Sequence, residues 1–131
     1  MSRLVQIALH TNRPLGTSSS PEALLALTPL GLVISEHIDK IGFFEPSVRV
    51  RDKEIAPDRV TFTLLCADTL AKPLEEIVRG FRIGCFRIAR EYGLVSPEDP
   101  TPIFSEGFAV KELTPEARAY FVHRLIRAAR Q

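Results

Sequence analysis

The residues best suited by type to ligand chemistry lie in a polar segment between positions 10 and 20. The candidates in this segment are His10, Asn12, Arg13, Thr17 and Ser18. We expect a strand before the segment and a helix after it, and the exposed N–H groups at a helix start attract anions. Because neither a Gly-Lys-[Ser/Thr] element nor a G-x-G-x-x-G motif is present, an ordinary loop rich in capping residues is the competing interpretation.

His10 could also serve as a general base if a carboxylate oriented it. In a split βαβ arrangement, strand ends that meet at one sheet edge would bring His10 near Asp58, Arg59 and Asp99. No nucleophile other than generic hydroxyl groups is identifiable beside them. We therefore name no catalytic residue and favour a protein that is not an enzyme.

The two cysteines and three histidines indicate no metal site. Cys66 and Cys85 form no C-x-x-C motif, and no two histidines share a ligand spacing, so neither a metal nor a cofactor is predicted. Both cysteines lie within apolar patterns, which favours buried thiols and a reducing, cytoplasmic compartment, although a disulfide between them stays open. No apolar run is long enough to cross a membrane, so we expect a soluble chain without membrane insertion.

The segment from Thr69 to Gly93 is predicted to be one helix with two usable faces. One face carries apolar residues at helical spacing and should pack on a core. The opposite face is not plainly polar, because Ile83 and Phe86 lie there among arginines. Arginine and aromatic residues are enriched where proteins meet partners. We therefore predict a partner interface formed by Arg79, Arg82, Ile83, Phe86 and Arg90.

Gly80 and Gly84 lie within the same helix and require a reason, since each costs about 1 kcal/mol relative to alanine. The absence of a side chain lets another backbone approach closely. Packing on the protein's own sheet is the favoured explanation, and a partner helix docked over the two glycines is the alternative.

A second basic group, Arg49, Arg51 and Lys53, alternates with valines in a predicted strand. Basic groups interleaved with aromatic residues can bind nucleic acid by phosphate pairing and base stacking. The formal net charge of +1 and the absence of an RNP-type aromatic pair count against this function. Charged residues that keep an edge strand from pairing with other chains are a further explanation.

The order of predicted elements favours an α+β fold. Strands are expected over 3–9, around 48–53, over 59–67 and over 103–113, the last one bulged near Gly107. Helices are expected from Ser20–Pro21 with a restart at Thr28–Pro29, over the long segment, and from Thr114 onwards. This order matches a ferredoxin-like split β-α-β-β-α-β with one antiparallel sheet and an added C-terminal helix, although another α+β topology would share it. At 131 residues, positions 1–131 fit a single domain.

These observations lead to three functional hypotheses. The favoured one is a non-enzymatic interaction or assembly subunit, which self-associates as a homo-oligomer or docks into a larger protein complex through the arginine-rich helix face. The first alternative is an RNA- or DNA-binding module. The second alternative is a small ligand-binding or enzymatic domain that uses the 10–20 loop.

Overall fold

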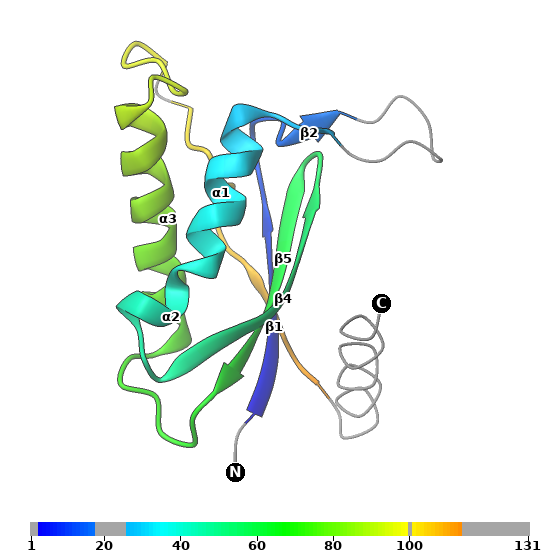
Figure 1. Cartoon of the computed structure of the whole chain (residues 1–131), viewed down its shortest axis with the longest axis vertical. Helices are drawn as coiled ribbons and strands as arrows, with labels where there is room; N and C mark the ends of the chain where they lie inside the picture. The colour runs from blue at the N-terminus through cyan, green and yellow to red at the C-terminus, as the bar shows by residue number, and fades with distance from the viewer. Residues whose placement is uncertain (1–2, 18–25, 100, 114–131) are drawn as a thin grey trace.

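The computed structural model describes residues 3–17, 26–99 and 101–113, which form an α+β structure (Figure 1). A four-stranded sheet with antiparallel pairing has the order β4-β5-β1-β6. Two short antiparallel strands, β2 and β3, form a second sheet. In the sequence they lie between β1 and α1. The elements are β1 (Arg3–His10), β2 (Gly16–Thr17), β3 (Ala26–Leu27), α1 (Pro29–Asp39), α2 (Ile41–Phe44), β4 (Val48–Ala56), β5 (Arg59–Cys66), α3 (Leu74–Glu91) and β6 (Ala109–Glu112).

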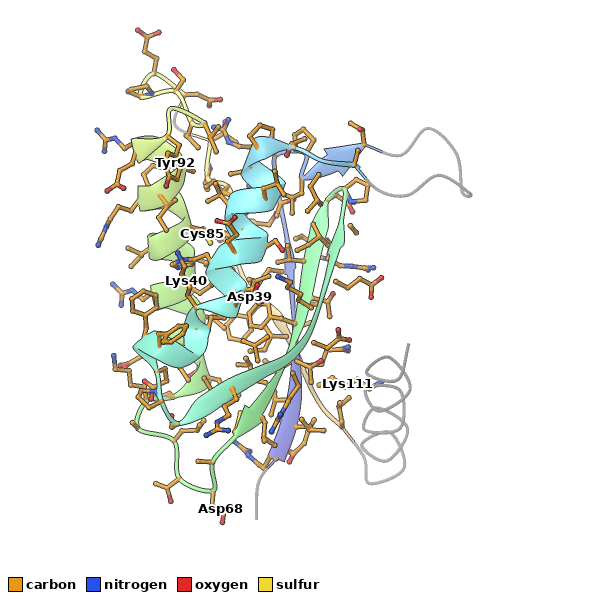
Figure 2. All side chains as sticks on the ribbon, in the orientation of Figure 1. Asp39, Lys40, Asp68, Cys85, Tyr92 and Lys111 are labelled. Carbon is orange, nitrogen blue, oxygen red and sulfur yellow. The ribbon has the colours of Figure 1, made fainter. Side chains whose placement is uncertain are left out.

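The core lies between one face of this sheet and the helices α1 and α3, which run side by side over it (Figure 1). Residues opposite each other in an antiparallel ladder share a face, so Ile7 and its partner Phe62 both point toward the helices. The ring of Phe81 from α3 packs 5.3 Å from the ring of Phe62, centroid to centroid. Lys111 projects from the other face of the sheet, away from α1 and α3 (Figure 2).

Local capping signals set the boundaries of both long helices. The Thr28 side chain accepts a hydrogen bond from the Gly31 N–H at 3.1 Å, and Pro29 occupies the first turn, as the sequence predicts. α3 begins at Leu74, later than expected, because the extended Pro73 precedes it. Its end follows the prediction, since Gly93 adopts a φ of +71° that favours glycine.

The strand expected over 103–113 is shorter than predicted. Phe104 makes only an isolated bridge to Thr11, and regular pairing starts again at Ala109. Between them Gly107 adopts a φ of +80°, which turns the backbone out of the extended conformation. The expected helix starts at Ser20 and Thr114 lie outside the described residues, but Ala26–Leu27, expected to belong to the first helix, form the strand β3 and pair with β2.

Among the described residues, no helix is long and apolar enough to cross a membrane. Cys66 and Cys85 are both free and buried, so the possible disulfide between them is absent. Burial raises the pKa of both thiols.

Candidate functional site

The outward face of α3 carries a stripe of two cations and two apolar side chains. Arg79, Ile83, Phe86 and Arg90 follow one another at steps of four, three and four residues, which places them on one side of the helix. All four are exposed; Ile83 retains 49% and Phe86 41% of its accessible surface. The sequence pattern therefore predicted their outward orientation correctly. We call these four residues the α3 stripe.

Arg82 belongs to the predicted interface but is already engaged within the protein. Its guanidinium donates a hydrogen bond to the carbonyl oxygen of Gly107. The same group lies 5.8 Å from the centroid of the Phe108 ring, at cation–π distance. Through these two contacts, Arg82 connects the segment before β6 to α3.

A groove runs beside the α3 stripe, between α3 and the segment 102–104. Ile103 and Phe104 are buried on its inner side, and Phe104 continues the aromatic packing of the core, with its ring 5.7 Å from that of Phe81. Phe86 also lines a second pocket, together with Arg90 and residues from the segment 95–99. The groove is lined by Arg82, Ile83, Phe86, Pro102, Ile103 and Phe104.

The loop after β1 holds the 102–104 side of this groove in place. The Asn12 side chain donates a hydrogen bond to the Pro102 carbonyl at 3.0 Å, and its backbone N–H donates to the Ile103 carbonyl at 2.8 Å. Arg13 donates to the Thr101 carbonyl at 3.1 Å. These contacts join residues nearly ninety positions apart in sequence.

Arg13 also forms an ion pair with Asp99, with 3.0 Å between nitrogen and oxygen. Hydrogen bonding from Thr101, with a further contribution from Arg13, lowers the pKa of the Asp99 carboxyl. The carboxylate therefore stays ionised and Arg13 stays occupied. Anion binding by Arg13 stays a prediction, although its Nη2 atom already contacts Thr101 and Asp99 within the protein.

Of the other residues predicted for the 10–20 loop, the structure describes His10, Asn12 and Thr17, and a ligand site there stays a prediction. His10 is exposed at the end of β1, and its partner across the ladder is Arg59, as expected from the strand ends. Asp99, which the sequence analysis also considered as a carboxylate partner for His10, forms an ion pair with Arg13. Thr17 is exposed in β2, and Ser18 lies outside the described residues.

The basic row expected on one strand face is divided by a β-bulge. The register of β4 against β5 shifts between Val50 and Asp52, with Arg51 as the extra residue. Arg49 consequently shares a face with Leu65, whereas Lys53 shares the helix-covered face with Phe62. Strict alternation predicted a single row because it allowed for no inserted residue.

Lys53 is also occupied by contacts within the protein. Its ammonium lies 2.6 Å from the Asp39 carboxylate and donates to the Ser35 carbonyl at 3.1 Å, both on α1. β4 forms one edge of the sheet, whereas Arg82 contacts the segment leading into β6 at the opposite edge. The strand residues and the α3 stripe are therefore separate surfaces.

A cavity of about 400 Å³ lies between α1–α2 and α3, and its lining includes Gly80 and Gly84, over which the sequence analysis allowed a partner helix to dock. His37 lines it, retains 7% of its accessible surface and stacks on Phe81 with a ring-centroid separation of 5.5 Å. Burial, with a smaller effect from Lys40, lowers the pKa of His37, which keeps the ring neutral near pH 7. Among the described residues, no hydrogen-bond partner lies at the buried Nδ1 of His37.

Metal binding finds no support in the described part of the chain. No group of three histidine, cysteine, aspartate or glutamate side chains lies close enough there to hold an ion. His123, the third histidine of the sequence, lies beyond the described residues.

Comparison with known proteins identifies similar folds. No protein-family profile and no curated protein sequence matches the chain. A candidate transposase from Deinococcus radiodurans has a similar structure, with a TM-score of 0.60 and 11% sequence identity; the match covers 97% of this chain and 89% of that one. A REP-associated tyrosine transposase bound to a REP hairpin gives a TM-score of 0.54 at 12% identity, covering 93% of this chain and 61% of the other.

These similarities overturn the favoured functional hypothesis. A non-enzymatic assembly subunit was the first choice because an exposed arginine and aromatic face is typical of protein contacts. These two solved structures are instead described as transposases. The surface residues that suggested a protein partner are of the same types that contact nucleic acid, so residue type alone could not separate the two classes.

Proposed function

We propose that this protein binds DNA through the α3 stripe and has a role in DNA processing. The observation that carries the proposal is an exposed aromatic side chain, Phe86, set between two exposed arginines on a fold similar to those of transposases. Transposases act on DNA, and the second similar structure has a REP hairpin bound. Of the three functional hypotheses, the nucleic-acid-binding alternative is the one supported by these similarities.

The spacing of the α3 stripe suits a nucleic-acid strand. Arg79 and Arg90 are eleven residues apart, so a rise of 1.5 Å per residue separates their backbones by about 16 Å. Phosphates could pair with the two guanidinium groups while a base stacks on Phe86 between them. Such a local arrangement does not require a strongly basic protein, which agrees with the formal net charge of +1.

The proposal extends to the architecture that presents this stripe. We propose a ferredoxin-like split β-α-β-β-α-β spanning a single domain, supported by the strand order β4-β5-β1-β6 and by helices on one face of the sheet. In this arrangement α3 is the second crossover helix. Its inner face packs on the sheet and its outer face is left for DNA.

Fluorescence anisotropy with a labelled DNA hairpin that carries a single-stranded tail tests the proposal. The Arg79→Ala/Arg90→Ala variant should bind about tenfold more weakly, the effect of losing two exposed charge pairs worth up to about 1 kcal/mol each. Arg49→Ala/Arg51→Ala removes the same charge from the exposed β4 edge and should bind like the unaltered protein. Equal weakening in both variants, or no saturable binding by the unaltered protein, would refute the use of the α3 stripe.

A further inference from the structure

The groove beside the α3 stripe is lined mainly by apolar and aromatic side chains, which suit contact with an aromatic ring. α3 contributes Phe86 and Ile83 to one side, and Pro102 and Phe104 line the other. We propose that this groove is a subsite for one unpaired nucleobase, stacked on Phe86. This inference rests on the proposed binding of DNA by the α3 stripe. It adds that the site prefers DNA with unpaired bases.

The groove is fixed before any ligand arrives. Asn12 holds the 102–104 segment through the Pro102 and Ile103 carbonyl groups. The Ser105 hydroxyl donates to the Asn12 side-chain oxygen at 3.0 Å, and the Ser105 N–H donates to the His10 carbonyl at 2.9 Å. A preformed wall reduces the entropy lost when a ring enters, which favours binding.

The positions of the arginines identify a nucleotide as the occupant rather than a free apolar molecule. Arg79 lies two turns before Phe86 on α3 and Arg90 lies one turn after it. A base that stacks on Phe86 would leave its sugar-phosphate backbone to run along the stripe, with a cation available on either side. The exposed ring and the flanking positive charges are thus complementary to the two parts of a nucleotide.

A base can reach the groove only when it is not paired. Bases within a duplex are stacked on their neighbours, and removing one requires unstacking and unpairing. Bases in a loop, bulge or single-stranded tail are free of that cost. The subsite therefore gives the protein a preference for unpaired DNA over duplex DNA.

Binding to three labelled DNA molecules of equal length tests this inference: an oligo-dT strand, a strand of abasic residues and a duplex. The unaltered protein should bind oligo-dT about 5- to 150-fold more tightly than the abasic strand, as expected for loss of one stacked base. It should also bind oligo-dT more tightly than the duplex, whose bases are paired, and equal binding to both would contradict the preference for unpaired DNA. Phe86→Ala should lose the difference between oligo-dT and the abasic strand. Phe44→Ala, which removes another exposed aromatic ring away from the groove, should keep it.

The possible failures are distinguishable. If oligo-dT and the abasic strand bind equally well, the base subsite is refuted while DNA binding by the stripe stands. If neither strand binds, the proposed function fails and the subsite falls with it. A 2-aminopurine base placed in the oligo-dT strand should lose fluorescence on binding to the unaltered protein, and an unchanged emission in the bound complex would also overturn the subsite.

Discussion

Gly84 of α3 lies directly against the imidazole ring of His37 from α1. A β carbon at position 84 would lie 2.3 Å from Nε2 of His37, a separation that real β carbons do not tolerate. Gly80, one turn earlier, differs sharply, because a β carbon there would meet no heavy atom within 4 Å. Neither glycine therefore packs on the sheet, which the sequence analysis had favoured: Gly84 permits a close approach of α3 to His37 of α1, and Gly80 meets open space.

Alanine substitutions at these two positions should change stability in opposite directions. Gly84→Ala should destabilise the protein by about 1–3 kcal/mol, because His37 must move out of its packed position. Gly80→Ala should stabilise it by up to about 1 kcal/mol through better helix propensity. Urea unfolding at pH 7.5 measures both. A stabilising Gly84→Ala would contradict the contact with His37.

The lowered pKa of His37 predicts a loss of stability in mild acid. The unfolded chain takes up a proton near the ordinary histidine pKa of about 6.5, whereas the buried ring stays neutral to lower pH. This contribution is fully present above about pH 6.5 and falls as the pH drops toward the folded pKa. Comparing urea midpoints at pH 7.5 and 5.5, His37→Phe should lose less stability than the unaltered protein. An equal loss in both would show that His37 is not the group responsible.

Breaking the contacts of Arg13 should weaken DNA binding from a distance. Arg13→Ala removes the hydrogen bond to the Thr101 carbonyl and the ion pair with Asp99, which loosens the wall of the groove. We expect a stability loss of about 1 kcal/mol and a several-fold rise in the Kd for oligo-dT. Lys53→Ala is the matched control, since it breaks the ion pair with Asp39 at the other sheet edge. Equal changes in Kd would argue that the wall has no part in binding.

The buried thiols should be unreactive in the folded protein. Burial disfavours the thiolate of Cys85 and of Cys66, and the thiolate is the reactive form. Ellman's reagent should therefore modify neither cysteine at pH 8 until urea unfolds the chain, when both react. Rapid modification without denaturant would contradict the packing of β5 against α3.

The sequence predicts those features that depend on neighbours along the chain. Thr28 and Gly93 mark helix ends because each acts on backbone groups within a few residues. The outward position of Phe86 follows from helical spacing in the same way. Periodicity and capping are therefore sufficient to predict the exposed stripe.

Features that depend on distant residues could not be predicted in this way. No local pattern links Arg13 to Asp99, so the sequence did not reveal that the loop after β1 contacts the segment 99–103. The bulge at Arg51 leaves the composition of β4 unchanged and still turns Lys53 to the opposite face. Both features escaped the sequence analysis because sheet register and loop contacts are set by tertiary packing.

The salt dependence of DNA binding is the most direct test of the central claim that the α3 stripe contacts phosphates. The logarithm of the binding constant for oligo-dT should fall linearly with the logarithm of salt concentration as counterions are released. Loss of two phosphate contacts in Arg79→Ala/Arg90→Ala should reduce the magnitude of that slope by about 1.4, at about 0.7 per contact on a single strand. The Arg49→Ala/Arg51→Ala variant should retain the slope of the unaltered protein. An identical slope in all three proteins would contradict the assignment of the DNA-binding surface to α3.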